Sequence, residues 1–218
     1  MIRNMNITDL IQDVRRIINE VAVENDTFTA EADAAIREFV RAAMVHLAAM
    51  PSYQGTPAIT TDESNIQFSP RPDGMMYAVI QPPADFLRPV SLELQGWIRP
   101  VTVFLPAHGS SFLSQYSSAP GIGAGPNSPV AFITSDAGSY IIAHSVQAET
   151  TYSLSYMAVP SVGADGTVSV PDRYRDALAY TASAFYLQSV NEYDAAKAAF
   201  DTAASYIQII DNKQIPSE

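Results

Sequence analysis

The stretch DFLRPVSLELQGWIRPV, from Asp85 to Val101, decides the fold that the sequence predicts. Apolar residues at positions 90, 92 and 94 alternate with polar ones, which is typical of a half-buried strand over Val90–Leu94. A second strand is predicted over Ile98–Phe104, after a glycine. Each of these segments contains or follows a proline, and proline confines a strand to the edge of a sheet or to a strand start.

The same stretch contains the candidate contact residues Arg88, Trp97 and Arg99, and Trp97 is the one tryptophan of the chain. Tryptophan and arginine are the residue types most enriched at the energetic centres of protein interfaces. The competing interpretation is a core tryptophan with solvated arginines. The stretch contains no histidine, cysteine or plausible nucleophile, so it favours a contact surface over a catalytic pocket.

On both sides of this stretch the sequence has a β-rich texture from residue 52 to residue 170. About six short strands are predicted there, separated by turn signals such as Asp73-Gly74 and Asp165-Gly166. The predicted strands are Met75–Ile80, Val90–Leu94, Ile98–Phe104, Val130–Ile133, Tyr140–Ala143 and Thr150–Met157.

A long loop rich in Ser, Gly, Ala and Pro is predicted over residues 113–128 of this β region. Loops of this length inside a compact domain are usually functional or mobile. Apolar residues at and near the loop extend the set of candidate interface residues: Phe112, Leu113 and Ile122.

Helical patterns flank the β region. Asn6 is a predicted cap for a first helix, whose apolar stripe is Ile7, Leu10, Val14, Ile17 and Val21. Thr29 is a predicted cap for a second helix, which Pro51 ends and whose apolar stripe is Ile36, Phe39, Val40, Ala43 and Leu47. Pro171 is predicted at the first position of a third helix, one face of which carries Tyr174, Leu178, Thr181, Phe185 and Gln188. Asn191 separates this helix from a last one with the stripe Tyr193, Ala196, Phe200, Ala203, Ile207 and Ile210.

These patterns predict an α+β protein. Residues 1–51 and 171–212 are expected to form one bundle from two helix hairpins. Residues 52–170 are expected to form a β-rich lobe inserted between those hairpins. Ile17, Phe39, Leu178 and Phe200 are the expected core residues of the bundle.

The composition of the chain excludes some classes of function and disfavours others. The 218 residues are 47% hydrophobic and 16% charged, with a net charge of −11 and only two lysines, which disfavours a phosphate-backbone binder. The chain has no cysteine, so it has no disulfide and no thiolate chemistry. With no signal-peptide core and no apolar run near 20 residues, we expect a soluble intracellular chain without a membrane partner.

No motif predicts catalysis, a cofactor or a metal. Gly121, Gly123 and Gly125 miss the spacing of a dinucleotide loop. The three histidines, His46, His108 and His144, lie in different segments without partners at metal-binding spacing. A hydrolase that uses Ser110 or Ser111 with His108 is a distant alternative, because the nucleophile elbow and a third triad member are missing. The alanine-rich final helices match a tetratricopeptide pattern once, and a solenoid needs about three copies.

Two segments carry a resemblance: DFLRPVSLELQGWIRPV at residues 85–101 and YRDALAYTASAFYLQSVNEYDAAKAAFDTAASYI at residues 174–207. Together with the helix pair, β insertion and helix pair, they resemble the head-to-tail adaptor proteins of tailed double-stranded-DNA bacteriophages. The run at 85–101 is similar to ring proteins of short-tailed, crAss-like phages. The loop at 113–128 is not part of this resemblance.

The resemblance implies a structural protein of the virion, assembled in the host cytoplasm, with no catalysis. It implies a homo-oligomeric, twelve-fold ring under the portal that seats the next tail or ring protein and extends the DNA channel. DNA would pass without specific binding, and an acidic wall would repel its phosphates. The alternative is a non-viral helical adaptor, a binding module whose β-lobe takes a ligand.

Overall fold

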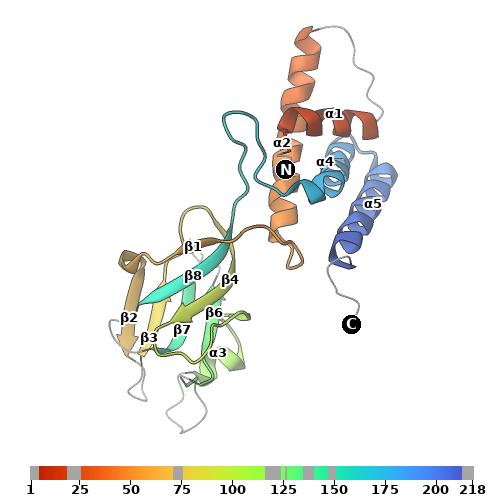
Figure 1. The fold of residues 1–218 in the computed structure, drawn as a ribbon. Coiled ribbons are helices and arrows are strands. Elements are labelled where there is room, and N and C mark those ends of the chain that lie inside the picture. Colours follow the sequence, from red (N-terminus) through yellow and green to blue (C-terminus); the bar gives the residue numbers. More distant parts are fainter. Residues whose placement is uncertain are drawn as a thin grey trace. The chain divides into compact units, whose positions relative to one another are not determined.

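The computed structural model describes residues 5–18, 26–70, 76–115, 124–125, 127–134, 140–146 and 151–212, with the side chains from residue 32 onward in the second helix. The chain forms two compact units (Figure 1). The helical unit combines residues 1–55 with residues 159–218, and the β unit is formed by residues 56–158. The protein is therefore an α+β protein in which helices precede and follow a β-rich region.

Four long helices form the described part of the helical unit, and one of them is central. The helices are α1 (Ile7–Ile17), α2 (Asp26–Ala49), α4 (Arg175–Ser189) and α5 (Tyr193–Asn212), with a short 3-10 helix, η2 (Asp172–Tyr174), before α4. Helix α4 contacts α1, α2 and α5. The two hairpins thus pack as one bundle, as the sequence predicts.

Helix α1 starts where the sequence places its cap. The side chain of Asn6 accepts a hydrogen bond from the Thr8 amide at 2.9 Å. Ion pairs then hold α1 to its neighbours: Arg15 contacts Asp33 of α2 at 2.8 Å, and Arg175 of α4 contacts Asp13 at 2.8 Å. The bond to Asp13 raises the pKa of Arg175. The cap therefore fixes where α1 begins, and the two ion pairs fix where it packs against α2 and α4.

The predicted helix stripes are buried in most positions. The buried members are Ile7, Leu10, Val14, Ile36, Val40, Ala43, Leu47, Tyr174, Leu178, Thr181, Ala196 and Ala203. Ile17, Phe39 and Phe200 are only partly buried, whereas Leu178 is fully buried. Tyr193 is wrong as a stripe member, since 64% of it is exposed at the start of α5.

Helix α4 is buried on more than one face because small residues line it. Residues 177–179 and 181–184 are all buried. Small side chains let three helices approach α4 closely. The two buried hydroxyls are satisfied within the helix, with Thr181 donating to Ala177 O at 2.7 Å and Ser183 to Ala179 O at 2.8 Å.

Three helix boundaries differ from the predictions. Helix α2 begins at Asp26, so Thr29 lies inside the helix and does not cap it. Pro171 precedes η2 in extended conformation (ψ 140°) and is not the first helical residue. Asn191 separates α4 from α5 with a positive φ of 64°, a conformation that asparagine tolerates better than most residues. Val21, in the predicted stripe of α1, lies outside the described residues.

Residues 159–170 belong with the helical unit, although the predicted boundary places them in the β lobe. The chain turns at Asp165-Gly166, and Gly166 has a φ of +81° that favours glycine. The amide of Ile7 donates to Gly166 O at 2.9 Å, and Val168 N donates to Met5 O at 2.8 Å. These bonds attach the turn to the start of α1.

The described residues of the β unit form two sheets (Figure 1). The three-stranded sheet has the order β1-β8-β4, and the five-stranded sheet has the order β2-β3-β7-β6-β5. The strands are β1 (Ala58–Thr60), β2 (Ile66–Pro70), β3 (Met76–Ile80), β4 (Phe86–Leu94), β5 (Phe104–Pro106), β6 (Val130–Thr134), β7 (Tyr140–Val146) and β8 (Tyr152–Ala158). All neighbouring pairs are antiparallel except β5 with β6.

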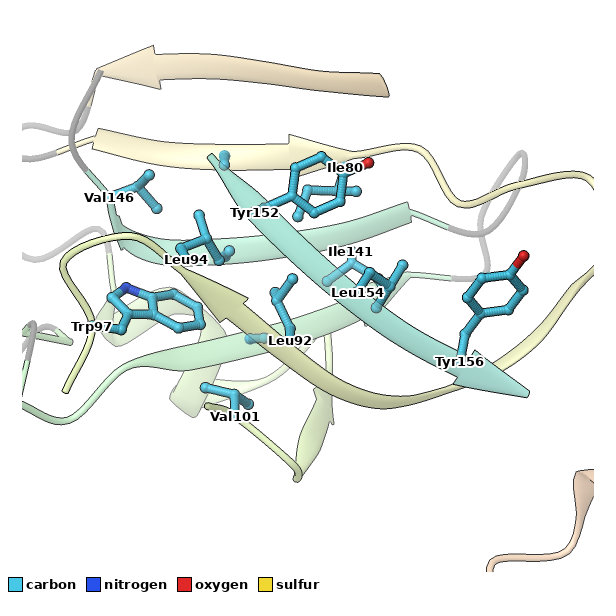
Figure 2. Packing of buried hydrophobic residues seen from close by; sticks show 13 residues of the cluster. Ile80, Leu92, Leu94, Trp97, Val101, Ile141, Val146, Tyr152, Leu154 and Tyr156 are labelled. Carbon is cyan, nitrogen blue, oxygen red and sulfur yellow. The ribbon is translucent and has the colours of Figure 1, made fainter. Parts of the chain in front are cut away.

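The inner faces of the two sheets share one core, and Figure 2 shows its side chains between the two sets of strands. Strand β8 alternates strictly at its start, with Tyr152, Leu154 and Tyr156 buried. Leu92 and Leu94 of β4 face the same core, as do Ile80 and Ile141 of the other sheet. This is the packing of a β-sandwich.

Proline positions match the sheet edges. Strands β4, β2 and β5 lie at edges, and they contain Pro89, Pro70 and Pro106. The predicted strand Ile98–Phe104 is wrong, because regular pairing begins only at Phe104. Strands β1 and β2 were not predicted, and β4 begins at Phe86, four residues earlier than expected. The turn signal at Asp73-Gly74 lies outside the described residues.

Candidate protein interface

The segment after β4 forms an arch, residues 98–100, that is anchored at both ends. Gly96 has a φ of +93°, a conformation that favours glycine, and the Trp97 amide donates to Leu94 O at 3.1 Å. Val101 and Leu92 exchange two backbone hydrogen bonds of 2.8 Å. A proline at position 100 cannot donate to a neighbouring strand, so the backbone between these anchors leaves the sheet.

The anchors of the arch lie in the core. Trp97 is 9% exposed and Val101 is 7% exposed, and both belong to the sandwich cluster (Figure 2). Trp97 is therefore a core residue of the β unit, as the competing interpretation expects. The single tryptophan holds one end of the arch in place from within the core.

The residues between and just beyond the anchors point to solvent. Ile98 is 72% exposed and Val103 is 70% exposed. Arg99 is exposed between them, and it forms no ion pair with any residue of the described ranges. Arg88, on β4, is only partly buried. Arginine is one of the residue types enriched at protein interfaces, and Arg99 is flanked here by exposed apolar side chains.

Phe112 lies against the outer face of the five-stranded sheet. It is carried by the short helix α3 (Ser110–Ser114), and its ring centroid lies 5.2 Å from that of Phe132 and 6.2 Å from that of His144. Phe132 and His144 are both fully buried. Phe112 thus covers a second, aromatic cluster on this sheet, while its neighbour Leu113 is 68% exposed.

The predicted loop 113–128 starts as a helix end. Gln115 is buried; its side-chain amide donates to Ser111 O at 3.2 Å, and its side-chain carbonyl accepts from the Ala124 amide at 2.7 Å. Gln115 therefore holds residue 124 beside α3. Residues 116–123, with the candidate Ile122, lie outside the described residues.

Carboxylates outnumber arginines on the described surface of the β unit. Asp62, Glu63, Asp85 and Glu93 are all exposed. Hydrogen bonds from Ser64 and Asn65 lower the pKa of Asp62. Glu63 and Glu93 line an open groove of about 530 Å³ together with Thr61, Gln95, Thr151, Tyr152 and Ser153.

Two tyrosines of β8 tie this surface to the core. Tyr156 donates its hydroxyl to Asp85 at 3.0 Å, and Tyr152 donates to the Asp62 carbonyl at 2.9 Å. Burial raises the pKa of both phenols, and the nearby carboxylates of Asp85 and Asp62 raise them further. Both phenols therefore stay neutral donors at ordinary pH.

The three histidines lie in different surroundings. His46 of α2 packs against the rings of Phe185 and Phe200, with centroids 5.7 and 6.5 Å away. His108 is exposed, and no hydrogen bond joins it to Ser110 or Ser111 among the described residues.

Within the described ranges no three His, Cys, Asp or Glu side chains are grouped as metal ligands. No helix in those ranges is long and apolar enough to cross a membrane.

A family model matches residues 5–216, which is almost the whole chain, and its description is SU10 adaptor protein. The chain belongs to the SU10 adaptor protein family. It is thus a phage adaptor-type structural protein and a component of the virion. Membership in a structural family implies a non-enzymatic role. No curated protein matches the chain.

Sequence reasoning missed the aromatic cluster under α3. The apolar residues of β6 and β7 alternate less than those of β8, because both faces of these strands are covered. A run such as VAFIT at 130–134 signals a strand buried on both faces. That signal could have predicted a cover for the outer face, and Phe112 provides it.

Proposed function

We propose that this adaptor protein forms a head-to-tail connector ring, joining the portal to tail or further ring proteins and extending the DNA channel. The match of residues 5–216 to the SU10 adaptor protein model carries the proposal. We propose a twelve-fold ring, as the resemblance at residues 85–101 to ring proteins of short-tailed, crAss-like phages implies.

The properties of the chain support a ring subunit that DNA passes without specific binding. The net charge of −11 gives a surface that repels phosphates, so a genome can slide past it. The described polar surface of the β unit is rich in carboxylates, whereas the described arginines of the helical unit are mostly paired.

We further propose that the β unit supplies contacts beyond the subunit. Arg99 and Leu113 are exposed, Arg88 is partly so, and Phe112 positions the helix that carries Leu113. Trp97 contributes by holding the arch. Ile122, from the segment between Gln115 and Ala124, belongs to the proposed surface by its position in the sequence.

The test is a phage that carries an amber codon in this gene, grown in suppressing and non-suppressing hosts. Without the chain, heads should package DNA and then fail to attach tails or lose the genome, which electron microscopy and nuclease-accessible DNA would show. The suppressing host is the control and should give normal particles. Tailed, infectious particles without the chain would contradict the proposal.

A further inference from the structure

We propose that the arch at residues 98–100, together with Val103, contacts a neighbouring copy of this chain, with Arg99 facing the neighbour's carboxylates. The inference rests on the proposed ring and names the surface that joins its subunits. The arch combines three properties that are each shown by the structure: a fixed backbone, exposed aliphatic groups and an exposed cation.

The backbone of the arch is held before any partner binds. Trp97 and Val101 are buried on its two sides, and Val101 exchanges two hydrogen bonds of 2.8 Å with Leu92. Pro100 restricts the remaining freedom. A surface that is already ordered loses little conformational entropy on association, so its contacts contribute more of their energy to affinity.

The exposed aliphatic side chains of the arch favour its burial against a partner, because removing apolar surface from water is favourable. Ile98 and Val103 are 72% and 70% exposed, five positions apart in one short segment. Ile59 of β1 is similarly exposed at 68% but lacks an adjacent arginine. The arch therefore differs from the rest of the described β unit in composition, and Ile59 offers a matched comparison.

Charge complementarity favours a second copy of this chain as the partner that binds the arch. Residues 56–158 contain seven acidic residues and three basic ones, and the whole chain has a net charge of −11. Copies of such a chain repel each other through their net charge, and a cation in their contact offsets part of that repulsion. Arg99 is exposed and has no ion pair within the described ranges, whereas Asp62, Glu63, Asp85 and Glu93 are exposed carboxylates that each copy presents.

Ring geometry fits this pairing. A contact that repeats around a ring joins two different patches of the same chain, so a cationic arch on one copy meets an acidic surface on the next. A tail protein or portal at the arch is the competing occupant, and the experiment below separates them.

The experiment places a photoreactive residue at the arch inside assembled particles. Cells that express Ile98→p-benzoylphenylalanine are infected with the wild-type phage, so that mixed rings form even if the variant alone does not assemble. Purified particles are irradiated and analysed by mass spectrometry. The matched control is Ile59→p-benzoylphenylalanine. We expect position 98 to give a product of two 23.6 kDa chains, at least about tenfold more abundant than the product from position 59.

Three results would overturn the inference: linkage of position 98 to a different virion protein, no linkage although the variant chain is present, or equal yields at both positions. Absence of the chain from purified particles would overturn the ring proposal as well, so the two failures can be told apart.

A charge variant gives an independent measurement. Arg99→Glu should lower incorporation of the chain into mixed particles by about tenfold or more relative to wild type, while Arg99→Lys should retain most of it. Both variants should keep the wild-type melting temperature, because the side chain is exposed. Normal incorporation of a folded Arg99→Glu chain would contradict the inference.

Discussion

The two units of this adaptor protein use their arginines differently. In the helical unit Arg15, Arg16, Arg41 and Arg175 each pair with a carboxylate, and two of these pairs join separate helices. In the described part of the β unit, Arg99 is exposed on an arch and has no ion pair. The comparison indicates that most described cations of the helical unit pair with carboxylates of the same unit, whereas the described part of the β unit leaves Arg99 unpaired at its surface.

The units also differ in what fixes their backbones. Helix packing in one unit depends on stripes that repeat over several turns, so no single residue decides the fold. In the β unit the path of the arch depends on a few positions, among them Gly96, Trp97 and Pro100. Single substitutions at buried anchors and at exposed residues should therefore differ more in their effect on unfolding free energy in the β unit than in the helical unit.

The largest expected effect is on the anchor of the arch. Trp97→Ala should lower the free energy of unfolding of the β unit by about 3–5 kcal/mol, because it leaves a cavity between the two sheets. Ile98→Ser, one residue further, should change it by less than about 0.5 kcal/mol. Denaturant unfolding of both variants measures the difference. Equal losses would show that the boundary between anchor and surface is misplaced.

The corresponding change in the helical unit is Leu178→Ala, at the centre of α4. Leu178 is fully buried, so the expected loss is about 2–5 kcal/mol. Gln188 lies on the same predicted stripe but is exposed at the end of α4, and Gln188→Ala should be nearly neutral. Similar losses for both residues would break the claim that α4 is buried mainly at its centre.

These comparisons show how much of the fold could be predicted. Helix stripes were predicted in most positions because burial repeats every three or four residues, and the cap at Asn6 was predicted because its hydrogen bond is local. The start of α2 was not predicted correctly. Thr29 is a plausible helix cap by residue type, but the helix begins three residues earlier, at Asp26.

Less of the β unit and of the candidate site could be predicted. A pattern of apolar residues at 97, 101 and 103 is compatible with a strand, and no periodicity shows that Gly96 and Pro100 divert the backbone. The exposure of Ile98 and the burial of Trp97 depend on where that diversion occurs. Strand β1 is a three-residue edge strand whose partner, β8, lies far along the chain, whereas β2 is an edge strand that pairs with the adjacent β3.

A smaller effect is expected at the cap of α1. Asn6→Ala should cost about 1 kcal/mol, because the Thr8 amide loses its acceptor. Asn6→Asp should restore most of the stability, since a carboxylate also accepts this hydrogen bond. Thermal or denaturant unfolding measures both variants. A neutral Asn6→Ala change would show that the turn at Asp165-Gly166 alone holds the start of α1.

In the β unit, a pH effect is expected at alkaline pH. Burial raises the pKa of Tyr156, and Asp85 raises it further. A folded-state pKa above the unfolded value of about 10 means that the stabilisation is present below pH 10 and is lost as the pH rises through the folded pKa. Tyr156→Phe should remove that part of the pH dependence, and Asp85→Asn should bring the Tyr156 pKa, followed by NMR, closer to 10.

The smallest expected effect is a pH dependence of stability at acidic pH, which arises from Asp165 in the helical unit. Its carboxylate accepts hydrogen bonds from the Thr167 amide at 2.9 Å and the Thr167 hydroxyl at 2.8 Å, and these bonds lower the pKa of Asp165 below its ordinary value of 3.8. A lowered pKa contributes stability that is present above the unfolded value and is lost as the pH falls through the folded value. Because the group is exposed, the change in unfolding free energy should be small. The sharper measurement is the Asp165 pKa itself, followed by NMR in wild type and in Thr167→Val, which removes the hydroxyl donor and keeps the amide. We expect Thr167→Val to raise the Asp165 pKa towards 3.8 without reaching it, and an unchanged pKa would show that the hydroxyl bond does not stabilise the turn against α1.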